Sequence, residues 1–152
     1  MQTTYGIVCL NPSNQILVGH VTRQPYDCWT IIKGLPEKNE KPLDVIKREF
    51  FEETSMFLHL ICKEIIDVSK TLDKIYNYTK SQKQLYGFVG ILHDNIDIAY
   101  FKCHSMVKDY SPLPDFPELD SFVWLDYQDI DILHYTQQDL IKDIFNNILK
   151  KE

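Results

Sequence analysis

A dense cluster of carboxylates follows a glycine-containing loop in the first half of this chain. Glu49, Glu52 and Glu53 are spaced i, i+3 and i+4, so they share one face of any helix that contains them. Three like charges on one helical turn repel each other, and the helix therefore needs a partner that neutralises them. A divalent cation that prefers oxygen ligands is such a partner. Upstream, Gly34 and Glu40 predict a tight loop that directs a fourth carboxylate toward the same place.

The segments around this cluster predict a strand, a loop and then a helix. Residues 27–33 form a short apolar run with β-branched side chains, which favours a strand. Pro42 suits the first turn of the helix that follows. Leu43, Ile46 and Phe50 recur at helical spacing and predict its buried stripe. A solvated acidic helix would lack this combination of loop, glycine and isolated arginine.

The pattern resembles the Nudix box. That motif has a glycine, five residues, Glu, seven residues, Arg-Glu, an aliphatic residue, any residue, Glu-Glu, any residue, Gly and an aliphatic residue. One position departs, because Ser55 stands where the box has its closing glycine, and we expect a slightly different turn there. The charged and glycine positions that match at the same spacing are Gly34, Glu40, Arg48, Glu49, Glu52 and Glu53.

The resemblance implies hydrolysis of a nucleoside diphosphate linked to another group, with Mg²⁺ or Mn²⁺ as cofactor. Glu49, Glu52 and Glu53 are the implied metal ligands and catalytic residues, and the Gly34 backbone is implied to approach the metal or a phosphate. The general base stays open between these glutamates and a loop glutamate. Arg48 is implied to orient a box glutamate, although an ordinary surface ion pair with Glu52 is the alternative.

Candidate substrate-binding residues lie outside the acidic turn. Lys33 before the glycine resembles the asymmetric dinucleoside tetraphosphate hydrolases, in which it would contact a phosphate; alternatively it is a solvated lysine at a strand end. Glu118, just before a predicted strand, resembles a position that reaches the catalytic water or a metal, or else belongs to an acidic loop. Tyr76 and Tyr86 could stack on a base, or they could be core residues.

Length and composition predict one intracellular domain covering residues 1–152. Four scattered cysteines predict reduced thiols, and a zinc site at Cys103 lacks partners at ligand spacing. No apolar run is long enough to span a bilayer, so we expect a cytoplasmic protein without membrane contact. A net charge of −6 argues against a large nucleic-acid footprint. The lysines between Lys63 and Lys83 form either a solvated hairpin or a local phosphate cradle.

The rest of the chain predicts a mixed sheet between helices. An Asn11–Asn14 turn joins the first two strands, prolines from Pro112 to Pro117 mark an irregular loop, and Thr136 is placed to cap a final helix. This order predicts an α+β fold, an α/β/α sandwich, and it resembles the Nudix fold over the full chain. The predicted strands are 3–10, 15–21, 27–33, 58–68, 74–79, 84–92, 96–103 and 121–125.

Markers after the box bear on the substrate. No proline occurs between Pro42 and Pro112, which argues against the ADP-ribose branch of the family. We therefore expect a nucleotide partner, either a dinucleoside polyphosphate or the 5′ end of a short RNA, with nucleoside triphosphates as an alternative. Another class of function is a Nudix-like sensor that binds a nucleotide without hydrolysing it. Only Ser55 favours a sensor, whereas the intact glutamates favour an enzyme.

Overall fold

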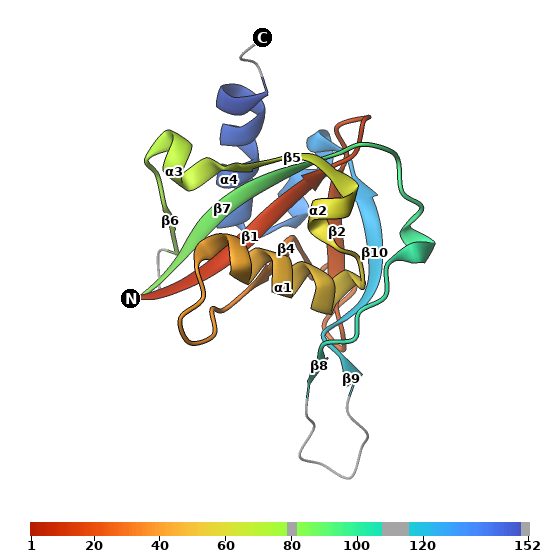
Figure 1. Cartoon of the computed structure of the whole chain (residues 1–152). Helices are drawn as coiled ribbons and strands as arrows, with labels where there is room; N and C mark the ends of the chain where they lie inside the picture. Colours follow the sequence, from red (N-terminus) through yellow and green to blue (C-terminus); the bar gives the residue numbers. More distant parts are fainter. Residues whose placement is uncertain (79–81, 108–115, 150–152) are drawn as a thin grey trace.

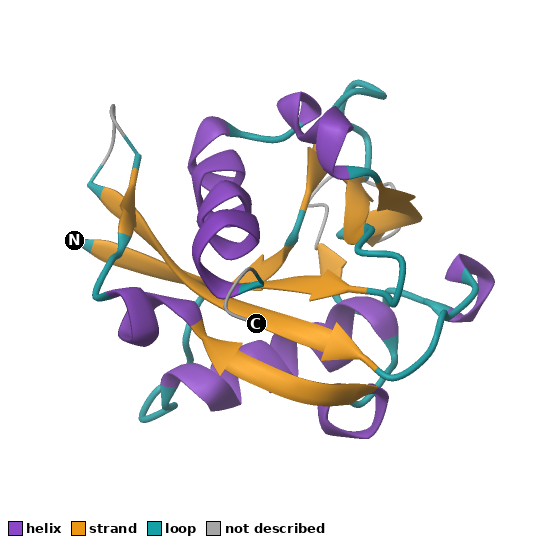
Figure 2. Ribbon diagram, turned by 90° about the horizontal axis from the view of Figure 1, so that it is seen from above, coloured by secondary structure: helices purple, strands orange, loops and turns teal. Residues whose placement is uncertain are grey.

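The computed structural model describes residues 1–78, 82–107 and 116–149. One mixed sheet forms its centre, and helices lie on both sides of it (Figures 1 and 2). The elements, in chain order, are β1 Gln2–Leu10, β2 Ile16–Val21, β3 Trp29–Thr30, β4 Ile32–Gly34, α1 Pro42–Thr54, α2 Leu58–Ile61, β5 Cys62–Asp67, α3 Val68–Leu72, β6 Tyr76–Asn77, β7 Lys83–Leu92, η1 Ile98–Tyr100, β8 Met106–Val107, β9 Phe116–Pro117, β10 Leu119–Leu125, η2 Tyr127–Ile132, α4 Tyr135–Asp143 and η3 Ile144–Ile148.

The parallel strands β1 and β7 form the middle of the sheet. They pair from Gln2 opposite Lys83 to Leu10 opposite Ile91. Both sequences are nearly continuous apolar runs because helices cover both faces of these strands. The order across the sheet is β10-β2-β1-β7-β5, and within the described residues β3, β4 and β6 add short pairings to β2, β1 and β7.

One edge of β1 is shared by two strands. β4 pairs with its middle residues, where Ile32 lies opposite Ile7, whereas β2 pairs at its last residue, where Ile16 lies opposite Leu10. The preceding strand β3 pairs with β2 instead. The short segment that carries β3 and β4 therefore crosses from β2 to β1, and the sheet divides at this point.

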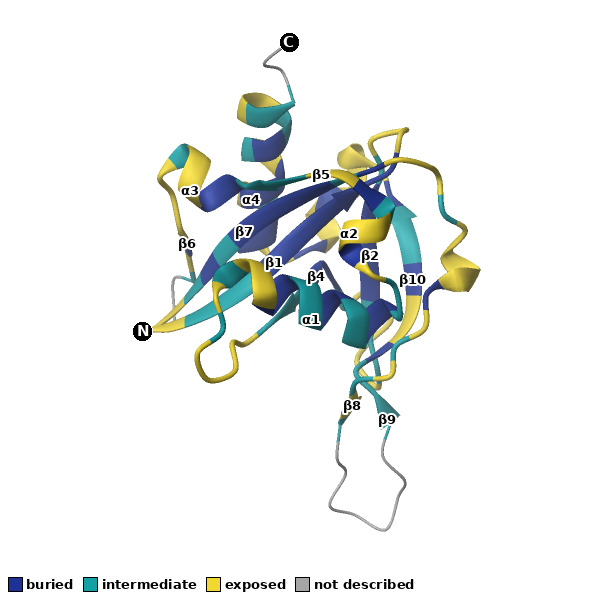
Figure 3. Ribbon diagram, viewed as in Figure 1, coloured by how far each residue is buried: buried dark blue, intermediate teal, exposed yellow. Residues whose placement is uncertain are grey.

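Buried apolar side chains form two clusters, one on each face of the sheet (Figure 3). Ile46, Phe50 and Leu58 of α1 and α2 pack on one face. Val68 of α3 and Leu140 of α4 belong to the cluster on the other face. This three-layer arrangement confirms the predicted α/β/α sandwich.

Helix α1 begins at Pro42, as predicted, and Ile46 and Phe50 are buried. The prediction for Leu43 was wrong, because this residue is 39% exposed and faces a groove on the outer surface. Val45 takes the inward position instead. The helix ends at Ser55, whose φ of 65° and ψ of 16° are left-handed. Ser55 therefore keeps the left-handed turn that the box glycine would form, and the slightly different turn predicted from the sequence is not observed.

Three predicted strands have clearly different bounds. Of the described residues in the predicted strand 74–79, only Tyr76–Asn77 form a strand, β6. Residues 58–68 begin with the helical turn α2 and become a strand only at Cys62. Residues 27–33 divide into β3 and β4, because the first part pairs with β2 and the second with β1. By contrast, the first hairpin and the long strand β7 agree with the sequence prediction.

The predicted strand 96–103 is absent from the described residues. This segment contains the single turn η1, and its later part bonds to the end of α1 instead of to a sheet. The Lys102 amide donates to the Thr54 carbonyl at 2.9 Å. Of the predicted proline loop, Pro112 and Pro114 lie outside the described residues, and Pro117 pairs with Met106 in a small ribbon.

Helix α4 begins earlier than predicted, because its N-cap is two residues before the predicted cap Thr136. His134 occupies the N-cap and its Nδ1 accepts the Thr136 amide at 3.2 Å, so Thr136 lies inside the helix. Leu140, Ile141 and Ile144 are fully buried, as their spacing predicts. In the described ranges, no helix has the length and apolar character needed to cross a membrane.

Candidate metal and substrate site

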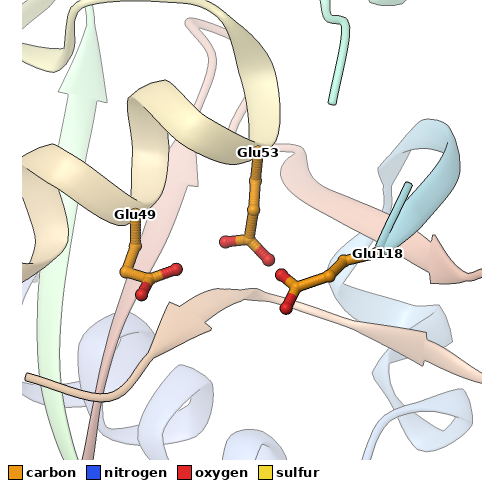
Figure 4. Close-up of side chains that lie close together, drawn as sticks. All are labelled: Glu49, Glu53 and Glu118. Carbon is orange, nitrogen blue, oxygen red and sulfur yellow. The ribbon is translucent and has the colours of Figure 1, made fainter. Parts of the chain in front are cut away.

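Three carboxylates from two distant parts of the chain converge at the division in the sheet. Glu49 and Glu53 project from α1, and Glu118 immediately precedes β10 (Figure 4). One oxygen atom from each lies within 4.8 Å of the others. Glu49 and Glu53 are only 8% and 4% exposed, so these charges are removed from bulk water.

Backbone hydrogen bonds hold Glu118 beside the end of α1. The Ser105 amide donates to the Glu52 carbonyl at 3.0 Å, and the Glu118 amide donates to the Ser105 carbonyl at 2.9 Å. The Glu118 carbonyl accepts the Thr22 amide at 3.0 Å. The residues after η1 thus use unpaired carbonyls at the helix terminus to attach a distant glutamate to the helix.

Burial dominates the electrostatics of the cluster. It raises the pKa of Glu49 to about 7, with smaller contributions from the charges of Glu52 and Glu118 and an opposing one from Arg48. The pKa of Glu53 is raised well above its usual range by burial and then by Glu49 and Glu118. Glu53 Oε2 is buried and has no hydrogen-bond partner among the residues that the structure describes. In the absence of a cation, folding therefore bears a cost for both carboxylates.

Arg48 connects the loop to the acidic helix. Its Nε and Nη2 each donate to the Glu40 carboxylate at 2.8 Å, and Nη2 also donates to the Leu35 carbonyl. Nη1 donates to Glu49 Oε1 at 2.9 Å and lies 3.2 Å from Glu52 Oε2. These contacts raise the pKa of Arg48, with the Glu40 hydrogen bond as the largest cause. The paired geometry fixes the guanidinium, and through it the Glu49 carboxylate.

Gly34 is required by space and not by backbone conformation, since its φ is not positive. A Cβ atom at this position would overlap the carboxylate carbon and both oxygens of Glu49. The glycine therefore makes room for the Glu49 side chain against β4. From the sequence we expected the Gly34 backbone to lie close to a metal or a phosphate, whereas its observed neighbour is Glu49, a predicted metal ligand.

A cavity of about 570 Å³ opens at the carboxylates. Lys33 and Arg23 also line it, and the charge of Lys33 lowers the pKa of Glu53, opposing the effect of burial. The Arg23 guanidinium lies 3.9 Å from the centroid of the Phe116 ring, a cation–π contact between the β2–β3 loop and β9. One cavity therefore presents both carboxylates and cationic side chains to any molecule that enters it.

The donor set fits a hard divalent cation. The three clustered groups are all carboxylates, which suit Mg²⁺ or Mn²⁺ better than softer metals. The partnerless oxygen of Glu53 is a buried acceptor without a donor. A cation between Glu49, Glu53 and Glu118 would satisfy this oxygen and offset the mutual repulsion.

Two predicted members of the acidic site lie outside the three-residue cluster. Glu52 is on the Arg48 side of α1, and its side chain is 33% exposed. Glu40 does not point toward the cluster as expected, because its carboxylate is paired with Arg48. Glu52 borders the cluster closely enough for its charge to raise the pKa of Glu49.

Neither predicted tyrosine lines the cavity. Tyr76 is buried on the α4 face, and its hydroxyl donates to Asp143 Oδ2 at 2.6 Å. Tyr86 lies on the α1 face of β7, and its hydroxyl donates to Asp67 Oδ2 at 2.7 Å. Their pKa values are raised mainly by burial. The structure thus gives both residues structural partners in place of the expected contact with a base.

Sequence reasoning missed Arg23 and Phe116. Arg23 follows β2 by two residues, and its backbone is left-handed, with a φ of 64°. The position of Arg23 just after a predicted strand could have marked it as a candidate. Its contact with Phe116 could not have been predicted, because it joins residues far apart in the chain without any fixed spacing.

Comparisons with known proteins agree with this geometry. A family model described as NUDIX domain matches residues 1–145. No curated protein gives a significant match. A Caenorhabditis elegans Ap4A hydrolase binary complex is 16% identical, with 95% of this chain and 96% of that chain covered and a TM-score of 0.61.

Two further solved structures have the same fold. The Escherichia coli dihydroneopterin triphosphate pyrophosphohydrolase is 13% identical, with 93% and 92% of the two chains covered and a TM-score of 0.62. The NUDIX domain of Shewanella oneidensis NrtR, complexed with ADP ribose, is 11% identical, with 95% and 86% covered and a TM-score of 0.65. At these identities the structural likeness supports the fold alone. Because the family model spans nearly the whole chain and its box glutamates are intact, the chain belongs to the NUDIX domain family and is a hydrolase of that family.

Proposed function

We propose that this chain is a Mg²⁺- or Mn²⁺-dependent pyrophosphohydrolase of a nucleoside diphosphate-linked substrate, preferably a dinucleoside polyphosphate or the 5′ end of a short RNA. The observation that carries this proposal is the cluster of the buried Glu49 and Glu53 with the half-buried Glu118, in one cavity with Lys33 and Arg23. Arg48 pairs with Glu49, but a purely structural role would not explain why Glu53 is buried beside it with one oxygen that has no hydrogen-bond partner among the described residues.

In the proposed mechanism, Glu49 and Glu53 would hold the cation, and Glu52, whose side chain lies outside the three-residue cluster, would join them by turning toward it. A bound ion of this kind neutralises phosphate oxygens and lowers the pKa of a water molecule. Glu118 or one of the helix glutamates accepts the proton of the attacking water. Arg48 acts as a positioning residue, because it holds Glu49 Oε1 at 2.9 Å while its other nitrogens are fixed by the loop.

The cationic side chains orient the substrate. Lys33 and Arg23 line the same cavity as the carboxylates, so a phosphate chain can contact both charge types at once. Val21 and Leu119 provide apolar wall on the same cavity. A phosphate chain held in this position is already oriented for in-line attack by water, so the reaction loses little further translational and rotational entropy.

Support for the substrate branch comes from the sequence and from one neighbour. The absence of a proline after Pro42 argues against ADP-ribose, and Lys33 before Gly34 is typical of dinucleoside tetraphosphate hydrolases. An Ap4A hydrolase is among the similar structures. A triphosphate pyrophosphohydrolase is another, so nucleoside triphosphates are the second candidate. The free buried thiols Cys9 and Cys62 agree with a cytoplasmic enzyme.

A substrate panel tests the proposal. Phosphate release, coupled to alkaline phosphatase, is measured with diadenosine tetraphosphate, a 5′-triphosphorylated short RNA, nucleoside triphosphates and ADP-ribose at equal concentrations. We expect one of the first two substrates to have the highest kcat/KM, and chelator to abolish activity. A clear preference for ADP-ribose would refute the branch, and full activity in a stringently metal-free preparation would refute the mechanism.

The sensor alternative loses its only sequence support. Ser55 was the one feature that favoured binding without hydrolysis, yet its backbone keeps the left-handed turn at the helix end. Tight nucleotide binding without turnover of any panel substrate, in the presence of Mg²⁺ or Mn²⁺, would restore this alternative.

A further inference from the structure

Three aromatic side chains gather at the start of α4. The His134 ring centroid lies 4.8 Å from that of Tyr78 and 4.3 Å from that of Tyr135. Tyr78 is half-buried, whereas His134 and Tyr135 are exposed, Tyr135 to 40%. We call these three residues the aromatic shelf. The His134 side chain also caps α4, whereas Tyr135 presents ring surface to solvent.

The shelf is fixed beside the cavity by the first turn of α4. Gln137 Oε1 accepts the Ile31 amide at 3.0 Å, and Gln137 Nε2 donates to Thr30 Oγ1 at 3.0 Å. Thr30 lines the cavity, as does Lys33 on the next strand. This buried glutamine therefore attaches the shelf to the strands that form the cavity wall.

Lys33 connects the shelf with the carboxylates electrostatically. Its positive charge lowers the pKa of Glu53 on the α1 side, and it contributes to the lowered pKa of His134 on the α4 side after the larger effect of burial. Lys33 is thus close to both groups. A phosphate chain that contacts Lys33 would therefore lie near both the carboxylates and the shelf.

We propose that the aromatic shelf of Tyr78, His134 and Tyr135 stacks on a nucleobase of the substrate, with the phosphate chain passing Lys33 on its way to the carboxylates. This inference rests on the proposed function and extends it from the phosphates to the base. Stacking of a base on an aromatic side chain tolerates any base, since every base has a π face.

Paired ligands and variants test the shelf. Adenosine tetraphosphate and inorganic tetrapolyphosphate carry the same number of phosphates, but only the first has a base. Their dissociation constants are measured by calorimetry with Mg²⁺ in a Glu53→Gln background, which prevents turnover. The shelf variant combines His134→Asn, which keeps an N-cap acceptor, with Tyr135→Leu, which keeps apolar bulk.

We expect the shelf variant to weaken adenosine tetraphosphate binding about 10-fold, in line with the loss of stacking, and to leave tetrapolyphosphate binding within about 2-fold. Equal weakening of both ligands, or of neither, would overturn the proposal. So would a parent protein that binds both ligands equally. Thermal unfolding checks that the variant is folded, and single variants replace it if it is not. A failed hydrolysis panel would refute the proposed function, whereas these binding constants decide the shelf independently of turnover.

Discussion

The two faces of the sheet bury different kinds of polar group. On the α1 face, Glu49 and Glu53 are buried as carboxylates, and one oxygen of Glu53 has no hydrogen-bond partner among the described residues. On the α4 face, the Tyr76 hydroxyl is paired with Asp143, and both ends of the Gln137 amide are hydrogen-bonded. The α1 face therefore gives up stability for a charge cluster, whereas these contacts on the α4 face stabilise the fold.

This contrast separates residues that serve chemistry from residues that serve folding. Removing a charge from the α1 face should damage activity while leaving the metal-free fold intact. Removing the contact between Tyr76 and Asp143 from the α4 face should damage the fold while leaving activity intact. Kinetics and unfolding measured on the same variants therefore test whether a residue serves activity or stability.

The largest effect is expected for Glu53→Gln. The substitution keeps the shape of the side chain but removes a charge needed for metal binding, so kcat should fall at least ~100-fold, the scale for losing one electrostatic contributor. In chelator its Tm should equal or exceed that of the parent, because repulsion from Glu49 and Glu118 is relieved. Glu64→Gln, on an exposed position of β5, is the matched control. A nearly fully active Glu53→Gln protein would make α1 a merely acidic helix.

The metal-free protein should lose stability as pH rises. Burial raises the pKa of Glu49 to about 7 from the usual 4.5, so above pH 4.5 the folded state binds more protons than the unfolded state. The stabilisation is complete below the unfolded pKa and is lost through the folded pKa, a change on the order of 2 kcal/mol between about pH 5 and 8. Urea unfolding in chelator measures this slope. Glu49→Gln should flatten it, and a rising slope in chelator would contradict the assignment.

Gly34→Ala should lower activity with little loss of stability. The three atoms nearest the added Cβ all belong to the carboxylate end of the Glu49 side chain, which can turn away once its contact with Arg48 is broken, so the fold tolerates the methyl group. The displaced carboxylate no longer holds its position, and kcat/KM should fall about 10-fold, as small misplacements of catalytic groups do. Steady-state kinetics and thermal unfolding, measured together, decide this point. Unchanged kinetics would show that the position of Glu49 is unimportant.

The same contrast explains what the sequence could predict. Box residues such as Glu49 and Glu53 follow helical spacing, and strands β1 and β7 follow continuous apolar runs, so local patterns were sufficient. The shelf and the Arg23–Phe116 contact depend on residues brought together from distant segments, for which no spacing exists.

The predicted strand 96–103 and the predicted base-stacking role of Tyr76 illustrate the same point. Residues 96–103 have the apolar content of a strand, but Lys102 bonds to the carbonyl of Thr54 at the end of α1. Tyr76 has the aromatic character of a base-stacking residue, but Asp143 from the other end of the chain accepts its hydroxyl. In both cases a long-range partner decided the outcome, and local propensity could not reveal it.

On the α4 face, Tyr76→Phe should destabilise the fold by about 1 kcal/mol through loss of a hydrogen bond to a carboxylate. Asp143 keeps its second partner, since Lys74 Nζ lies 2.8 Å from the same oxygen, and this limits the cost. Urea unfolding gives the stability, and kcat/KM on the best panel substrate should be unchanged. A marked fall in kcat/KM with normal stability would return Tyr76 to the substrate site.

The smallest effect is expected at Ser55, where the backbone conformation favours glycine and the hydroxyl contacts favour serine by similar free energies. Its left-handed backbone favours glycine by roughly 1 kcal/mol. Its hydroxyl, however, donates to the Lys102 carbonyl at 2.5 Å and lies 2.9 Å from His104 Nδ1, contacts that join α1 to the segment leading to Glu118. Exposed hydrogen bonds of this kind contribute about 0.5–1.5 kcal/mol, so Ser55→Gly should change the free energy of unfolding by less than about 0.5 kcal/mol. Ser55→Ala keeps the strain and loses the contacts, and it should be the less stable of the two variants. If alanine and glycine were equally stable, backbone strain at this helix end would be negligible, and the hydroxyl contacts alone would explain the serine.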